Sequence, residues 1–460
     1  MKNWSGLRIL IIGAARQGLA AGRFLARHGA LVTINDQRSA DQLAEARQAL
    51  AGLEIRWAAG GHPLELLDDT DLVCLSGGVP LTLPIVVEAG RRGLALTNDS
   101  QIFMEAVPCR VIAITGSAGK TTTTTLVGRM AKSAVQPPVR AWVGGNIGLP
   151  LIDHLDEIGA QDLVILELSS FQLELMTRSP QVGAILNITP NHLDRHGTMD
   201  AYAAAKAHIL THQSPEDIAI LSRDEIGAWA QRSKVAGRLV SFGLARPLAG
   251  ETGTYVEHGQ ICLHTPAGDQ VLLDAEKIRL RGQHNLYNVL AACAIAHAAG
   301  FSAAAMEAGV EDFRGVTHRL EWVRTWHGAN WYNDSIPTAP ERTMAAIRSF
   351  EEPLVLLLGG RDKDLPWGDL AALVRERVDH VVVFGEAALK ILAALGTTSA
   401  GARPFSIQAC SGLQQAVQAA AQVVEAGDVV LLSPGGTSYD EFKDFEQRGE
   451  RFREWVKQLS

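Results

Sequence analysis

The sequence predicts an α/β protein built from mostly parallel sheets, and three observations favour this class. Short apolar runs of strand length recur along the 460 residues, alanine-rich helical stretches lie between many of them, and several runs end in Gly or Ser. Strands that alternate with helices form βαβ units, and such sheets bind ligands beyond the carboxyl ends of their strands. The runs are 7–12, 31–34, 71–75, 111–114, 163–168, 182–188, 354–358, 381–384 and 429–432.

The runs fall into three groups, and a chain of 460 residues has room for about three domains. We expect a Rossmann-like first domain over residues 1–105. A central domain with a mostly parallel sheet should cover 106–316. A second Rossmann-like domain should cover 317–460.

Composition excludes several classes of protein. The chain is 47% hydrophobic and 20% charged, as in ordinary globular proteins. A net charge of -8 gives no basic surface for nucleic acid, although local groups can still bind an anion. The five cysteines lack CxxC spacing and are expected to be buried thiols in a reducing compartment. The first residues lack a signal-peptide layout, and no apolar run approaches the ~18 residues of a membrane span, so we expect a cytoplasmic protein without membrane insertion.

The first domain begins with a strand, a glycine turn and a helix, over residues 7–28. Gly13 and Gly18 permit a tight turn and a phosphate close to the helix N-terminus. Ala15 stands where the dinucleotide pattern has its middle glycine, so NAD is not favoured. Asp36 ends the second strand and can accept hydrogen bonds from a ribose or a base. These residues alone leave a nucleotide site and a plain strand–helix turn equally open.

The central domain begins with a stronger signal over residues 111–122: a hydrophobic strand, a Gly-rich loop and a helix start. Backbone amides of such a loop, together with the helix dipole, hold phosphate. Lys120 would neutralise the β and γ phosphates, and the Thr121 hydroxyl would face Mg²⁺. The full Walker pattern has a further glycine where Ile114 stands, so this loop has a shortened form of that pattern. We predict a P-loop ATPase-like central domain.

Polar side chains follow the next strands. Glu167 ends the run 163–168, and a carboxylate there, beside a phosphate loop, is a natural Mg²⁺ ligand, with a surface glutamate as the alternative. His192 lies in the polar segment after the run 182–188, where a plain loop histidine is also possible. Lys206, taken alone, indicates a solvated helix lysine. Asn285 and Asn288 share one helix face and could hold an adenine or a ribose.

Together these segments resemble the Mur ligase family over essentially the whole chain. The matching segments, in the family's order and spacing, are 115–121, 145–148, 167–172, 187–194, 282–288, 318–319 and 333–335. The end of the chain, 432–438 and 442–449, resembles the D-glutamate-adding branch. The resemblance implies an ATP-dependent, ADP-forming ligase. It would join D-glutamate to UDP-N-acetylmuramoyl-L-alanine through an acyl phosphate, in cytoplasmic peptidoglycan precursor synthesis. The expected state is a monomer.

The resemblance also implies roles for residues of this chain. Those expected near the UDP-linked substrate are Arg16, Gln17, Asp36, Arg38, Ser76, Gly77, Asn146 and Ser169. Those expected at ATP are Gly116, Ser117, Ala118, Gly119, Lys120, Thr121, Thr122, Asn285, Asn288, Arg319 and Asp334. Those expected at glutamate are Thr338, Lys363, Ser438 and Phe445. Those expected at Mg²⁺ are Thr121, Glu167, His192 and Lys206, the last as a carbamate. The expected catalytic residues are Lys120, Glu167, His192 and Lys206.

Two departures from the family pattern keep alternatives open. Ala118 replaces an Asn, and Ile336 replaces the Lys that follows Asn-Asp-Ser, with Thr338 and Arg342 as nearby polar groups. A ligase for L-glutamate is therefore one alternative. A folylpolyglutamate-synthase-like ligase would lack the first domain. An inactive nucleotide-binding paralogue would not need the catalytic residues just named. A P-loop kinase is a further alternative, and the observation that separates it from a ligase is whether phosphate release requires an amino acid.

Overall fold

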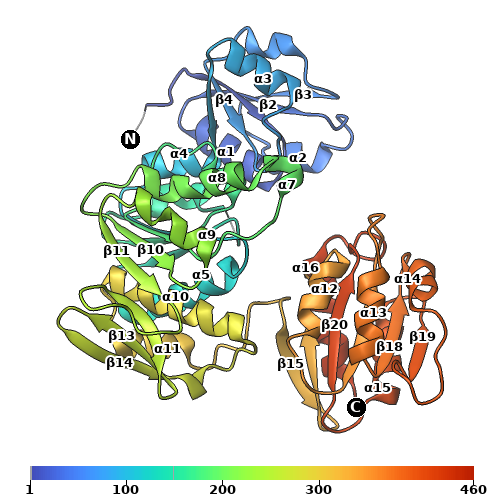
Figure 1. Ribbon diagram of the computed structural model, residues 1–460. Coiled ribbons are helices and arrows are strands. Elements are labelled where there is room, and N and C mark those ends of the chain that lie inside the picture. The colour runs from blue at the N-terminus through green and yellow to red at the C-terminus, as the bar shows by residue number, and fades with distance from the viewer. Residues whose placement is uncertain (1–2, 149) are drawn as a thin grey trace. The chain divides into compact units, whose positions relative to one another are not determined.

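Three β-sheets follow one another along the chain, as Figure 1 shows by colour. The computed structural model describes residues 3–148 and 150–460. Two compact units contain them. The first unit holds the first two sheets, up to Asp312, and the second unit holds the third sheet together with Arg279–Gln283. The predicted α/β class is confirmed, and the predicted domain boundaries at 105/106 and 316/317 stay predictions.

The first sheet is parallel, in the order β3-β2-β1-β4-β5. Its strands are β1 (Arg8–Ile12), β2 (Leu31–Asp36), β3 (Ile55–Ala59), β4 (Leu72–Leu75) and β5 (Ala95–Asn98). Its helices are α1 (Arg16–Arg27), α2 (Ala44–Ala49), η1 (Leu64–Leu67), α3 (Pro84–Arg91) and α4 (Asp99–Ala106). Alternate residues of β1 enter two different apolar clusters, one on each face, so the strand reads as one hydrophobic run.

The central sheet has the order β14-β13-β12-β11-β10-β9-β6-β8-β7. Its strands are β6 (Arg110–Thr115), β7 (Ala141–Gly145), β8 (Leu163–Glu167), β9 (Val182–Ile185), β10 (Ile218–Ser222), β11 (Arg238–Phe242), β12 (Gly253–Glu257), β13 (Gln260–Thr265) and β14 (Gly268–Asp274). The strands from β7 to β12 run parallel, and β12, β13 and β14 form an antiparallel meander. Because β6 lies between β8 and β9, the loops after these three strands meet at one edge.

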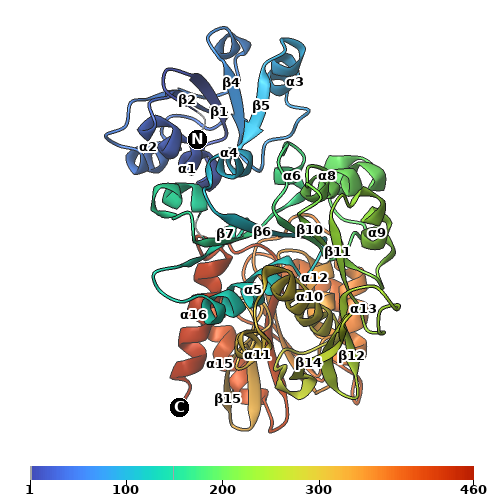
Figure 2. The ribbon, with the colours of Figure 1, turned by 90° about the vertical axis from the view of Figure 1, so that its left-hand side faces the viewer.

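Helices cover the central sheet on both faces of its parallel part. They are α5 (Lys120–Ala134), η2 (Leu151–Glu157), α6 (Ser170–Leu173), α7 (Leu193–His196), α8 (Met199–Thr211), α9 (Ile226–Trp229), η3 (Ala230–Lys234), η4 (Ala275–Lys277), α10 (Gln283–Ala299) and α11 (Ala303–Val310). Figure 2 shows α4 of the first domain close to α6, where the Asn98 side chain donates a hydrogen bond to the Gln172 carbonyl at 2.7 Å.

The third sheet has the order β15-β16-β20-β17-β18-β19, with only β15 antiparallel to its neighbour. Its strands are β15 (Glu321–Trp326), β16 (Ala329–Asn333), β17 (Leu354–Gly359), β18 (His380–Phe384), β19 (Ser406–Ala409) and β20 (Val429–Gly435). Its helices are α12 (Pro340–Ile347), α13 (Gly368–Arg377), α14 (Ala388–Leu395), α15 (Leu413–Val423) and α16 (Phe445–Gln458). One apolar cluster lies on each face. Across the described residues, no helix is both long and apolar enough to span a membrane.

Candidate active site

The Gly-rich loop of residues 116–119 joins the end of β6 to the start of α5. Gly119 has a φ of +80°, and a Cβ atom there would lie 2.3 Å from the Asn288 side-chain oxygen, so the position requires glycine. The Lys120 Nζ atom donates hydrogen bonds to the carbonyl oxygens of Gly116, at 2.8 Å, and Ser117, at 3.3 Å. In this structure the lysine is therefore folded back over its own loop.

Neighbouring elements hold the loop in shape. The Asn187 side-chain oxygen, just after β9, accepts a hydrogen bond from the Ala118 amide at 2.8 Å. The Ser117 hydroxyl lies 3.0 Å from the Tyr202 hydroxyl of α8. Asn288 of α10 donates to the Asn285 side-chain oxygen at 2.9 Å and packs against Gly119. The structure thus brings the predicted phosphate loop and both predicted asparagines together.

Glu167 ends β8 beside this loop, and its side chain is buried, with 1% exposure. Its Oε1 atom accepts a hydrogen bond from the Asn146 side-chain amide at 2.9 Å. Among the residues that the structure describes, its Oε2 atom is buried without a hydrogen-bond partner. A buried carboxylate oxygen without a partner costs free energy, and a cation would satisfy it.

Lys206 of α8 is buried as well, with 1% exposure, so the expectation from the residues alone, a solvated helix lysine, is wrong. Its Nζ atom donates to the Gly116 carbonyl at 2.9 Å, the same oxygen that Lys120 contacts. Burial and the nearby positive charge of Lys120 lower the pKa of Lys206 to about 6, while the Glu167 carboxylate acts in the opposite direction. The amine is therefore mostly uncharged at neutral pH.

His192 follows β9 and directly precedes α7, with a left-handed backbone at φ +54° and ψ +31°. This conformation is uncommon outside glycine and is found disproportionately at functional sites. Its ring is exposed and meets the Phe171 ring edge-on, with centroids 5.1 Å apart. Within the described part of the chain, no group of three or more His, Cys, Asp or Glu side chains is arranged to hold a metal ion. A metal at Glu167 would therefore need further ligands of another kind.

At the carboxyl edge of the first sheet, the turn after β1 packs on the loop after β4. A Cβ atom on Gly18 would lie 2.0 Å from the Gly13 carbonyl, and one on Gly13 would lie 2.9 Å from the Ser76 Cβ atom. The Gln17 side-chain oxygen lies 2.4 Å from where a Gly77 Cβ atom would be. The predicted residues Gln17, Ser76 and Gly77 are thus neighbours, held together by the absence of side chains at the glycines.

Asp36 is buried at the end of β2, and both of its oxygens have protein partners. The Ala14 amide donates to Oδ2 at 2.8 Å, and the Arg38 amide and Nε both donate to Oδ1 at 2.9 Å. The hydrogen bonds from Arg38 are the largest cause that holds the pKa of Asp36 well below its usual range. Asp36 therefore fixes the turn and orients Arg38, whose side chain, like that of Arg16, is exposed.

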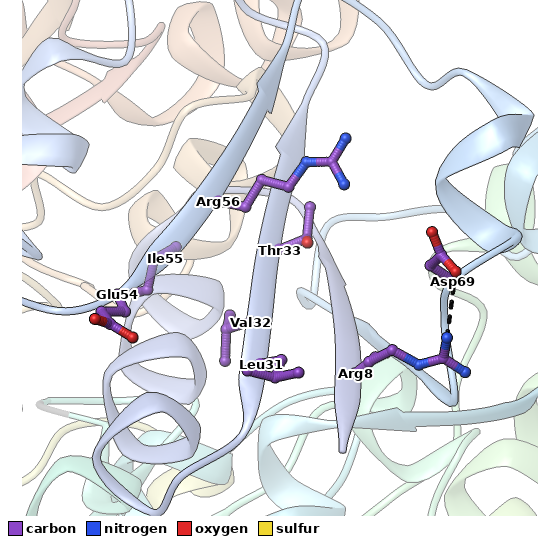
Figure 3. Close-up of a pocket in the computed structure, with 8 residues that line it drawn as sticks. All are labelled: Arg8, Leu31, Val32, Thr33, Glu54, Ile55, Arg56 and Asp69. Atoms are coloured by element: carbon purple, nitrogen blue, oxygen red, sulfur yellow. Dashed lines mark hydrogen bonds and ion pairs between the residues drawn. The ribbon is translucent and has the colours of Figure 1, made fainter. Parts of the chain in front are cut away.

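A surface groove in the first domain, drawn in Figure 3, lies at the opposite end of the same sheet. It is lined where β1, β2 and β3 begin, by Arg8, Leu31, Val32, Thr33, Glu54, Ile55, Arg56 and Asp69. None of the predicted site residues lines it. In parallel sheets the amino ends of strands are the unusual place for a ligand, so we do not assign the groove to the active site.

The second unit contains the residues predicted to hold glutamate and part of ATP. The Lys363 Nζ atom lies 3.5 Å from the Thr338 hydroxyl. The Ser335 hydroxyl donates to the Phe445 carbonyl at 2.8 Å. Asp334 is buried and accepts hydrogen bonds from the Ser433 hydroxyl and the Leu320 amide. Burial raises the pKa of Asp334 to about 6.

Ser438 is buried in the chain segment after β20, and Arg319, which is half-buried, precedes β15. The positive charge of Arg319 partly offsets the effect of burial on Asp334. The structure brings Arg319 and Asp334 together, and Thr338 and Lys363 together, all within the second unit. Arg342 also lies close enough to Asp334 to act on its pKa in the same direction.

Sequence reasoning missed two buried residues. Tyr202 supports both the loop, through Ser117, and Lys206, whose Nζ atom lies 4.7 Å from its ring centre. Tyr202 precedes Lys206 by four residues, so both lie on one helix face, and this spacing could have indicated their contact. Arg448 is fully buried in α16 and donates to the Ser335 and Gly436 carbonyls at 2.7 and 3.0 Å. Arg448 lies in the segment 442–449 that carried the resemblance, but the sequence analysis gave it no role, because arginine in an amphipathic helix is normally exposed.

Comparison with known protein families gives three matches along the chain. Residues 7–98 match the Mur ligase MurD-like N-terminal domain, residues 114–296 the Mur ligase middle domain, and residues 318–436 the Mur ligase glutamate ligase domain. Among solved structures, MurC of Thermotoga maritima has a TM-score of 0.56 at 19% identity, covering 98% of this chain and 99% of its own. MurF ligase of Thermotoga maritima in complex with ADP has a TM-score of 0.56 at 16% identity, with 100% of both chains covered. These two likenesses concern the fold.

Curated relatives match over nearly the full length. The UDP-N-acetylmuramoylalanine–D-glutamate ligase of Geobacillus kaustophilus is 41% identical over 455 residues, which cover 98% of each chain. The protein of the same name from Pelotomaculum thermopropionicum is 39% identical over 461 residues, covering 100% of this chain and 99% of its own. The one from Symbiobacterium thermophilum is 38% identical over 453 residues, covering 98% of each chain. The chain belongs to the Mur ligase family.

Proposed function

We propose that this protein joins D-glutamate to UDP-N-acetylmuramoyl-L-alanine, with conversion of ATP to ADP and phosphate, in cytoplasmic synthesis of peptidoglycan precursors. The observation that supports this most is the buried, unpartnered Oε2 atom of Glu167 beside the phosphate loop. A site with Lys120 on the phosphate loop and with a spare carboxylate oxygen that a cation would satisfy suits transfer of a highly charged phosphoryl group. The names of the full-length relatives supply the two substrates.

In the first step, the alanyl carboxylate of the substrate attacks the γ-phosphorus of ATP. The bond from that phosphorus to the bridging oxygen breaks, and an acyl phosphate and ADP result. The loop amides of residues 116–119 would hold the phosphates, and Lys120 would exchange its carbonyl partners for phosphate oxygens. Asn285 and Asn288, which lie against the loop, with Arg319 and Asp334, would hold the nucleoside part.

Mg²⁺ fits the residues at this edge. The Oε2 atom of Glu167, the Thr121 hydroxyl, His192 and a carbamate on Lys206 would hold it, and the ion would offset negative charge on the phosphates. A carbamate forms when an uncharged amine attacks CO₂ and loses a proton, which turns a cation into an anion. The lowered pKa of Lys206 supplies the uncharged amine.

In the second step, the uncharged amine of glutamate attacks the acyl carbon, the carbon–oxygen bond breaks, phosphate leaves, and the nitrogen loses a proton to give the amide. Thr338, Lys363, Ser438 and Phe445 would hold the glutamate, with Lys363 opposite a carboxylate. The UDP-linked substrate would lie at the carboxyl edge of the first sheet. The residues proposed to bind it are Arg16, Gln17, Asp36, Arg38, Ser76, Gly77, Asn146 and Ser169.

The test is phosphate release from ATP and Mg²⁺ in the presence of UDP-N-acetylmuramoyl-L-alanine. Reactions with D-glutamate, with L-glutamate and with no amino acid are compared. We expect release with D-glutamate only. Release with L-glutamate only would keep the ligase chemistry and assign the specificity change to the region of Ile336. Release that needs no amino acid, or none at all, would overturn the proposed function.

A further inference from the structure

Arg195 connects the first domain to the short helix that follows His192. It lies in α7, and its guanidinium donates hydrogen bonds to two consecutive carbonyls of the loop after β4. Nη1 is 3.2 Å from the Gly78 oxygen, and Nη2 is 2.6 Å from the Val79 oxygen. The planar fork of arginine can bond two acceptors in this way, whereas a lysine ammonium acts as a point charge.

The same guanidinium lies over the Phe171 ring, 4.1 Å from its centre. That ring is stacked in turn against His196, with centroids 5.3 Å apart and an interplanar angle of 14°. The His196 Nε2 atom lies 3.0 Å from the Ser170 hydroxyl. The short helices α6 and α7 are therefore packed against each other through the side chains of Phe171, Arg195 and His196.

The loop that Arg195 contacts, residues 76–79, has few side chains that could stabilise its conformation. Gly77 and Gly78 occupy its centre. The Val79 amide bonds the Ser76 carbonyl at 2.9 Å, and the Ser76 amide bonds the Ile12 carbonyl at 3.0 Å. Gln17 lies against Gly77. The loop is thus held by the β1–α1 turn within the first domain and by Arg195 from the central domain.

We propose that Arg195 is a positioning residue for the UDP-linked substrate. It fixes loop 76–79 of the first domain against the short helix that follows His192, so the two substrate-facing edges keep a defined geometry. This inference rests on the proposed function, because it assigns loop 76–79 to that substrate. Loss of the two hydrogen bonds should weaken binding of the UDP-linked substrate and leave ATP and glutamate unaffected.

The test compares steady-state kinetics of Arg195→Met with those of the unaltered protein. Methionine keeps an apolar stem over Phe171 and removes both hydrogen bonds. We expect KM for UDP-N-acetylmuramoyl-L-alanine to rise about tenfold or more, since hydrogen bonds from a charged group are lost. The kcat value and the KM values for ATP and glutamate should stay within about twofold. Arg195→Lys should show a smaller rise, because it restores the charge without the fork.

Arg140→Met is the matched control. Arg140 stacks on Trp142 at 4.6 Å and donates to the Glu157 carbonyl, so it makes the same kinds of contact just before the start of β7. Its substitution should leave every KM unchanged. Calorimetric titration of UDP-N-acetylmuramoyl-L-alanine without ATP should give a dissociation constant that rises in Arg195→Met in step with KM.

An unchanged KM and dissociation constant in Arg195→Met would overturn the inference, as would a fall in kcat alone. Thermal unfolding checks that the variants are folded, and if Arg195→Met does not fold, the comparison of Arg195→Lys with the unaltered protein decides. The proposed function fails separately, when the unaltered protein releases no phosphate in response to glutamate.

Discussion

The loop after β1 and the loop after β6 have the same local design, a glycine turn between a buried strand and a helix, yet they differ in how their polar groups are used. In the first domain, the carboxylate of Asp36 bonds Ala14 and Arg38, and both of its oxygens are occupied. In the central domain, Glu167 keeps one buried oxygen without a partner, and Lys120 and Lys206 share one carbonyl.

This difference teaches how to separate a scaffold from a reaction site. A buried polar group with full protein partners stabilises the fold, whereas a buried group left without one indicates that something else satisfies it. At the first loop, Arg16 and Arg38 are exposed, and the turn beneath them is held by the hydrogen bonds of Asp36. Beside the second loop, the Oε2 atom of Glu167 has no hydrogen-bond partner among the described residues. Substitutions beside the second loop should therefore reduce activity more than stability. Substitutions at the first loop should reduce stability more than kcat.

The largest effect is expected from Lys206→Ala. Loss of the proposed carbamate should reduce D-glutamate-dependent phosphate release about 1000-fold, the scale on which removal of a charge-stabilising group acts. Small carboxylic acids such as acetate should restore part of the rate by supplying an anion in the vacated space. Lys234→Ala, at an exposed lysine of η3, is the control and should be unaffected. Undiminished turnover in Lys206→Ala would refute the carbamate.

Glu167→Gln should reduce activity about 100-fold by removing a metal ligand, and added Mg²⁺ should recover part of it. The amide oxygen can still accept from Asn146, so the fold should not be weakened. Removal of a buried charge should even leave the melting temperature unchanged or raise it. A variant that loses stability and keeps its Mg²⁺ dependence would contradict the contrast drawn between the two loops.

Asp36→Asn should show the reverse pattern. The amide keeps one acceptor oxygen, but it loses the hydrogen bonds that the second carboxylate oxygen accepts and the charge opposite Arg38. The free energy of unfolding should therefore fall by about 1–3 kcal/mol, while kcat changes little and KM for the UDP-linked substrate rises. Because the folded pKa of Asp36 is depressed, its contribution to stability is present above the unfolded value of about 4 and is lost as the pH falls below it. Denaturant titrations of both proteins at neutral and acid pH check this. A stability difference that persists or grows toward low pH would contradict it.

The smallest effect is expected in the groove at the amino ends of the first sheet. Arg56 is exposed there and pairs across the sheet with Thr33. Arg56→Ala should change unfolding free energy by less than about 0.5 kcal/mol and leave all kinetic constants unaltered. A raised KM for the UDP-linked substrate would move the substrate site from the carboxyl edge of the sheet to this groove.

The sequence predicted strands best where both faces of a strand are buried. The run 163–168 became β8, and 429–432 became most of β20, because parallel strands covered on both sides consist almost wholly of apolar residues. The meander β12–β14 was missed for two reasons. Strand β14 exposes most of its first residues, and β12 and β13, although largely buried, have apolar stretches of only two or three residues between polar ones. The edge strands β3 and β5 were missed for the same reason as β14.

By itself the sequence determined the α/β class and the phosphate loop, because both depend on local order: apolar runs of strand length, and glycines next to a lysine and threonines. Only the tertiary structure decided which polar groups are buried together. Lys206 meets Gly116 across 90 positions of sequence, and Arg448 meets Ser335 across 113. Burial, and with it the lowered pKa of Lys206 and the spare oxygen of Glu167, depends on which elements pack around a residue, and the order of strands and helices in space sets that.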